Sequence, residues 1–282
     1  MNVVAASVLG SLFGALNMPW PFEREYLQLA LVAGLVVGVC APLIGAYLVQ
    51  RNLSLMGDGL GHLAFAGVGL ALLTDTSPLW IALAVTIVGA LIVERIRARS
   101  KSSGDLALSL VFYAGLAMGS VLLGRAGAGA KASSYLFGSL LSIDRSETLV
   151  VVVSGAVIVT VMSVIGRSLF AVLVDEEGAA VGGLPVRALN DVLMVLTAIT
   201  VVVGMRTVGI LLVSALMVLP VGASKALTTS FRSLLLVGSA FGVGSVVIGL
   251  VLSRVLDTFA GGTIVLVASA AFLLASLVGR RR

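Results

Sequence analysis

Long apolar runs, separated by short charged or turn-forming segments, dominate the chain. Residues 26–50 form one such run without a single charge, and about 20 residues suffice for a helix to cross the roughly 30 Å of hydrocarbon in a bilayer. The runs are rich in Leu, Val and Ala and lack the alternation of polar and apolar residues typical of barrel strands. The pattern therefore predicts an all-α polytopic membrane protein.

Charges and turn residues divide the chain into about nine predicted transmembrane spans. Only Met205, Arg206 and Thr207 separate the sixth span from the seventh. The seventh is therefore either a full span or a half-helix that enters the bilayer and turns back, which would leave eight. The nine spans cover residues 27–49, 55–73, 79–93, 106–123, 149–165, 189–204, 208–222, 234–252 and 263–278.

The distribution of basic residues predicts the orientation. If the first span ends on the cytoplasmic side, that side collects most of the 18 Lys and Arg residues, including Arg95, Arg97 and the final Arg280–Arg282. Cytoplasmic loops carry such an excess, so we expect a protein of the cell membrane with its N-terminus outside and its C-terminus in the cytoplasm. No linker divides the chain, and residues 1–282 are expected to form one domain, with residues 1–20 as an N-terminal lead-in.

Composition agrees with this reading. The chain is 59% hydrophobic and only 11% charged, with a mean hydropathy of +1.18, whereas a soluble domain is about 25% charged. The pI near 9.9 requires no nucleic-acid partner, because basic loops account for it and lipid is the expected surrounding. Cys40 is the only cysteine, so neither an internal disulfide nor a thiolate cluster can form.

Asp58 and His62 stand out because they are ionisable residues within a predicted span. They are four residues apart, so on a helix both side chains project from one face. Imidazole and carboxylate together suit zinc, manganese or iron. A proton relay and a purely structural pair are the alternatives from the residues alone. Ionisable residues inside spans are functional by default, and nearby Gly57, Gly59 and Gly61 would admit a partner helix or a ligand.

Several enzyme classes are excluded or disfavoured. With one histidine the chain cannot contain an H-E-x-x-H zinc motif, and no G-x-x-x-x-G-K-[ST] phosphate loop occurs. We therefore expect a non-enzyme, with any ATP hydrolysis performed by another polypeptide. A serine protease would need Ser214 or Ser245 beside His62, and serines in apolar helices usually bond to their own backbone. Two ligands are also too few for a closed zinc site, which takes four, so a two-fold dimer or other groups must contribute.

Residues 174–190 form a long inner connection with the signals of a short helix. Asp175 is the predicted N-cap, Glu176 and Glu177 lie in the first turn, and Gly182 and Gly183 stop the helix. Pro185 then starts the next helix. These signals favour a compact helix that docks into a groove, rather than an ordinary connector.

Four segments in order resemble the permease subunits of zinc and manganese ABC importers. They are "PLIGAYLVQRNLSLMGDGLGHLAFAGVGLALL", with its G-D-x-x-x-H helix, "YLFGSLLSI", "VGILLVSALMVLPVGASKAL" and "DTFAGGTIVLVASAAFLLAS". The resemblance extends from about residue 21 to the C-terminus. It implies the fold of an ABC importer transmembrane domain, acting as a homodimer with a separate cytoplasmic ATP-binding subunit and an extracytoplasmic metal-binding protein.

The resemblance also assigns residues. Asp58 and His62 match the family's metal-contact pair in the membrane, and the transported zinc or manganese would be bound only transiently, with no cofactor of the permease's own. Residues 176–184 match the segment that contacts the ATPase, with Glu176, Glu177, Gly178, Ala179, Gly182 and Gly183 as its coupling residues. The alternative is a secondary, proton-coupled metal transporter that acts without an ATPase, with Asp58 carrying the proton.

Overall fold

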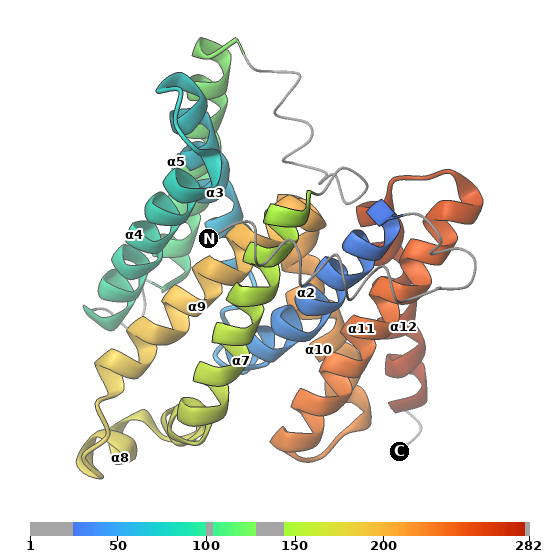
Figure 1. The fold of residues 1–282 in the computed structure, drawn as a ribbon. Helices are drawn as coiled ribbons and strands as arrows, with labels where there is room; N and C mark the ends of the chain where they lie inside the picture. The colour runs from blue at the N-terminus through green and yellow to red at the C-terminus, as the bar shows by residue number, and fades with distance from the viewer. Residues whose placement is uncertain (1–24, 100–103, 128–143, 280–282) are drawn as a thin grey trace.

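The protein is a bundle of α-helices. The computed structural model describes residues 25–99, 104–127 and 144–279. The predicted lead-in at residues 1–20 and the "YLFGSLLSI" segment at residues 135–143 lie outside the described residues. The helices, labelled as in Figure 1, are α2 (Glu25–Gln50), α3 (Met56–Leu73), α4 (Pro78–Arg99), α5 (Gly104–Arg125), α7 (Arg145–Val174), α8 (Glu176–Val181), α9 (Val186–Thr207), α10 (Ile210–Leu227), α11 (Phe231–Leu256) and α12 (Ala260–Gly279).

The described helices confirm the predicted fold class. Eight of them are long and apolar enough to cross a membrane. The seventh predicted span corresponds to α10, whose apolar part, Leu212–Leu227, is shorter than the others. Only Val208 and Gly209 separate α9 from α10, which agrees with the near absence of a loop predicted there.

Several helices are longer than the spans predicted from hydropathy, among them α4 and α7. Helix α4 continues to Arg99 rather than ending near residue 93, and α7 covers Arg145–Val174 rather than residues 149–165. The prediction stopped where charged residues begin, because charge ends a membrane span. Charge does not end a helix, since arginine is a good helix former, and both helices continue past their apolar segments.

The helices form two packed groups. Helix α3 packs against α4 and α5. Helices α10, α11 and α12 pack against one another, and α10 and α11 also pack against α2 (Figure 1). Helix α9 contacts both groups, through α3 and α4 on one side and α2 and α10 on the other. Short α8 lies at the same end of the molecule as the C-terminal end of α12 (Figure 1).

Burial distinguishes central from peripheral helices. In α3, 78% of the residues in the most apolar window are buried, whereas the figure is 22% in α5 and in α7. The outer faces of α5 and α7 remain apolar, with Leu110, Val157 and Val164 exposed, as lipid-facing surfaces should be. The residues with candidate chemistry therefore lie in the most enclosed helix of the described bundle.

Close contact between α2 and α10 depends on Gly45. A Cβ atom added at this position would clash with the backbone carbonyl of Met217 in α10. Backbone cannot move aside as a flexible side chain can, so the two helices can approach this closely only while residue 45 lacks a side chain.

Replacing Gly45 should therefore destabilise the bundle. We expect Gly45→Ala to cost about 1 to 3 kcal/mol of stability through overpacking, measured as a lower unfolding temperature of the purified protein in detergent. Gly244→Ala is the matched control, because an added Cβ in α11 would meet nothing within 4 Å. Equal unfolding temperatures for the two variants would contradict this account of α2–α10 packing.

Candidate functional site

Asp58 and His62 lie on the first two turns of α3. Asp58 belongs to the first turn and is half-buried, whereas His62 is 6% exposed. Their spacing on a continuous helix places them on one face, as the sequence predicts. Helices α5 and α10 pack against this part of α3 and determine the surroundings of the pair.

Asp58 is held by a serine from α10. The Ser214 hydroxyl donates a 2.6 Å hydrogen bond to Asp58 Oδ1. Helix α10 comes close enough because Gly57 faces it: a Cβ atom at Gly57 would lie 3.2 Å from the Ser214 Cβ. The bond restrains the carboxylate and leaves its second oxygen available as an acceptor.

His62 is enclosed by α5. The Phe112 ring lies edge-on to the imidazole, with ring centroids 4.4 Å apart and planes inclined at 75°. Gly115 also faces His62 so closely that a Cβ atom there would lie 2.9 Å from the His62 carbonyl carbon. Phe112 thus packs against the imidazole, and Gly115 allows α5 to approach the backbone of His62.

The Nδ1 atom of His62 is buried and has no hydrogen-bond partner among the described residues. A buried polar atom without a partner costs about 1 to 3 kcal/mol, and buried polar atoms are rarely left in that state. Imidazole nitrogen is a preferred ligand of divalent transition metals. The geometry therefore fits a metal ligand, and the metal-binding role of Asp58 and His62 stays a prediction.

The described part of one chain contains no group of three or more His, Cys, Asp or Glu residues that could hold a metal ion. One copy then supplies one imidazole and one carboxylate. This matches the ligand shortage noted from the sequence, so backbone groups, water or a second copy would have to complete a coordination shell.

Sequence reasoning missed the role of Ser214. Both serines were expected to bond to their own backbone, which is correct for Ser245, whose hydroxyl donates to Phe241 O at 2.7 Å. For Ser214 the expectation is wrong, because its donor bond goes to Asp58. An isolated serine in an apolar span carries no signal of its partner. Only the packing of α10 on α3 identifies it.

The inner connection contains the helix predicted for it. Helix α8 covers Glu176–Val181, and the Asp175 carboxylate accepts a 2.9 Å hydrogen bond from the Gly178 backbone N–H, as an N-cap does. Gly182 is the C-cap, and Gly183 has a φ of 83°, a left-handed conformation that favours glycine. Pro185 is the N-cap of α9. The docking role of α8 stays a prediction.

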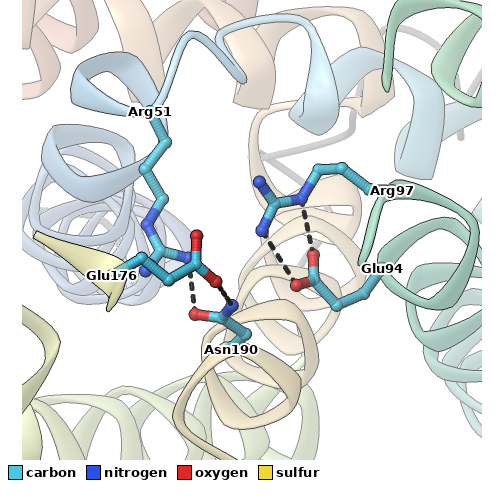
Figure 2. A network of polar contacts seen from close by, with 5 residues as sticks. All are labelled: Arg51, Glu94, Arg97, Glu176 and Asn190. Carbon is cyan, nitrogen blue, oxygen red and sulfur yellow. Dashed lines mark hydrogen bonds and ion pairs between the residues drawn. The ribbon is translucent and has the colours of Figure 1, made fainter. Parts of the chain in front are cut away.

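Charges gather at the α8 end of the molecule. Glu176 accepts a hydrogen bond from Asn190, which also accepts one from Arg51, while Glu94 and Arg97 pair nearby (Figure 2). Arg95 and Asp191 form a further ion pair at 3.3 Å between α4 and α9. Of these residues, only Glu176 was singled out by the sequence analysis as a site residue.

Comparisons with known proteins place these features in context. A model of the ABC 3 transport family matches residues 23–279. The manganese transport system membrane protein MntC of Halalkalibacterium halodurans is 32% identical over 264 residues, which is 92% of this chain and 90% of that protein. A Haemophilus influenzae protein, named as a probable iron transport system membrane protein, is 32% identical over 256 residues, 90% of this chain and 94% of its own.

A solved structure shares the fold as well. PsaBC from Streptococcus pneumoniae, determined in complex with a Fab, matches with a TM-score of 0.81 and 28% identity, over 96% of this chain and 94% of that one. The similarity therefore covers almost all of the described helices, including α3 and α8.

Ser214 should matter for metal binding because it restrains Asp58. We expect Ser214→Ala to raise the Kd for Mn²⁺ about tenfold, the lower end of the range for residues that orient metal ligands. Calorimetric titration of the purified protein measures this. Ser245→Ala is the control, because that hydroxyl bonds only to its own helix. If the two variants bound Mn²⁺ equally well, Ser214 would have no part in positioning the carboxylate.

Proposed function

The chain belongs to the ABC 3 transport family, whose model matches residues 23–279, and from this we propose that it carries manganese into the cytoplasm. It is the multi-pass membrane permease of an ABC-type metal importer and is not itself an enzyme. The absence of a G-x-x-x-x-G-K-[ST] loop from the sequence agrees with ATP hydrolysis by a partner subunit.

The observation that carries the proposal is the pair on α3. Asp58 and His62 lie together on a buried helix, one restrained by Ser214 and the other with a buried, unpartnered Nδ1 among the described residues. Such an arrangement offers a metal ion two donors without forming a closed site. Binding that is favourable for entry and weak enough for release is what a conduction path needs.

Manganese is the preferred cargo among the metals that the donors admit. One imidazole and one carboxylate accept manganese, zinc or iron. The relative from Halalkalibacterium halodurans is named for manganese transport and the one from Haemophilus influenzae for iron. The sequence analysis left zinc and manganese open, and of these two metals the names of the relatives favour manganese.

The orientation and the partners complete the proposal. The α8 end of the bundle carries Arg51, Arg95 and Arg97, and this excess of basic residues supports a cytoplasmic location for it. Two copies of the permease form the pathway, a cytoplasmic ATP-binding subunit docks on α8, and an extracytoplasmic binding protein delivers the metal. ATP binding and hydrolysis then alternate which end of the pathway is open.

Loss of either side chain of the pair should abolish transport. We expect His62→Ala and Asp58→Ala each to stop Mn²⁺ uptake into proteoliposomes that contain the permease, its ATPase and the binding protein, while the complex still assembles. Thr86→Val is the control, since Thr86 is buried in α4 and bonds only to Ala82 O. Uptake at the normal rate in either α3 variant would refute the role of the pair.

The same system separates the importer from the proton-coupled alternative. Uptake should require ATP inside the liposomes and should cease without the ATPase subunit. A panel of Mn²⁺, Zn²⁺ and Fe²⁺ identifies the preferred metal. Uptake by the permease alone, driven by a pH gradient, would support the secondary transporter instead.

Helix α8 should contact the ATPase through Val181. This valine is 91% exposed, and α8 lies outside the candidate spans, so lipid does not explain the exposure. We expect Val181→Asp to weaken ATPase binding about tenfold or more, as loss of a well-packed interface contact does, measured with immobilised permease. Phe259→Ser is the control, because Phe259 is 83% exposed in the turn between α11 and α12. Unchanged binding by Val181→Asp would exclude this contact.

A further inference from the structure

Five polar side chains from four parts of the chain meet at the α8 end of the bundle. Figure 2 shows Arg51 from the turn after α2, Glu94 and Arg97 from α4, Glu176 from α8 and Asn190 from α9. They bring the proposed coupling helix together with the turn that leads into the proposed metal-binding helix.

Asn190 is the centre of this arrangement. Its side chain accepts a 2.7 Å hydrogen bond from Arg51 Nη1 and donates a 3.1 Å hydrogen bond to Glu176 Oε1. Asn190 is only 4% exposed. The buried amide therefore bridges a half-buried guanidinium and an exposed carboxylate that belong to different elements.

Neighbouring charges act on the Arg51 guanidinium in opposite directions. Burial lowers the pKa of its guanidinium and Arg97 acts in the same direction, whereas Glu176 and Glu94 raise that pKa. Glu94 is only 3% exposed and forms a two-bond pair with Arg97, both bonds 2.9 Å long. Two arginines and two glutamates thus share one region, and a shift of Glu176 changes the balance of charge around Arg51.

Arg51 is rigidly joined to α3. The turn after α2 is closed by backbone hydrogen bonds from Leu53 N to Leu48 O at 2.8 Å and from Met56 N to Leu53 O at 3.0 Å. Asn52 within it has a φ of 58°, a left-handed conformation. Asp58 follows in the first turn of α3. Displacement of Arg51 would therefore be passed to the start of the helix that carries Asp58 and His62.

Helix α8 does not pack extensively against α3 among the described residues. Helix α8 packs mainly against α7 and α9, its neighbours in the chain. The hydrogen-bonded series Glu176–Asn190–Arg51 joins α8 to the α2–α3 turn directly.

We propose that Glu176, Asn190 and Arg51 form the internal link that transmits movement of α8 to α3. This inference rests on the proposed function, because it assigns the route by which the ATPase drives transport. Asn190 acts as a positioning residue: it touches neither metal nor ATPase, and it holds Glu176 and Arg51 in register.

The experiment compares variants of Asn190 in the full complex of permease, ATPase and binding protein. Asn190→Ala removes both hydrogen bonds, and Asn190→Asp keeps an acceptor for Arg51 but repels Glu176. We expect each variant to hydrolyse ATP but to move about tenfold less Mn²⁺ per ATP, the effect of one charge-assisted hydrogen bond. Because Asn190 is buried, ATPase binding should be unchanged, and so should Mn²⁺ binding at equilibrium.

Two controls exclude a general loss of structure. Asp191→Asn breaks a more exposed ion pair, with Arg95 of α4, at the position next to Asn190 in α9, and should leave Mn²⁺ per ATP unchanged. Arg51→Lys retains a charged donor for Asn190 and should preserve more coupling than Arg51→Met.

The outcomes separate this inference from the proposed function. Normal Mn²⁺ per ATP in either Asn190 variant that assembles, or an equal loss in Asp191→Asn, overturns the link while leaving the importer intact. Failure of the unaltered complex to take up any metal would overturn the proposed function instead.

Discussion

A carboxylate inside a membrane span costs about 2.5 to 3.5 kcal/mol even on the mild insertion scale, and the packing around α3 follows from this cost. Asp58 recovers part of it through the bond from Ser214, which requires α10 to lie close against α3 at Gly57. His62 is enclosed by Phe112 and Gly115 of α5. Its buried Nδ1 has no hydrogen-bond partner among the described residues. A bound metal ion would give this nitrogen a partner.

The polar groups at the α8 end lie in a different environment from the pair on α3. They lie where the helices leave the apolar region, and each buried charge there is paired or bridged: Glu94 by Arg97, and Arg51 through Asn190 to Glu176. Buried ion pairs add little stability compared with apolar packing. Their value here is geometric. The bridge through Asn190 joins α8 and α9 to the α2–α3 turn, and this turn leads to the pair on α3.

The helices could be predicted from the sequence because membrane spans are recognisable by their length and hydropathy. The caps of α8 could be predicted from residue type. Helix ends were less accurate, because α4 and α7 continue past the charges that end their apolar segments. Asp58 and His62 were found as ionisable residues in an apolar run. Ser214 and Asn190 were not, since a hydroxyl or an amide in a helix is ordinary until a residue 156 or 139 positions away lies beside it.

The size of the donor set bears on the cargo. One imidazole and one carboxylate leave most of a coordination shell to water, backbone or a second copy of the chain. Zinc that is held permanently prefers a closed tetrahedral shell of nitrogen and sulfur ligands. Manganese accepts carboxylate and water oxygens in an octahedral shell. Under the proposed function, so sparse a pair would suit manganese in transit, and it would hold the ion weakly enough for release when the proposed link through Arg51 moves α3.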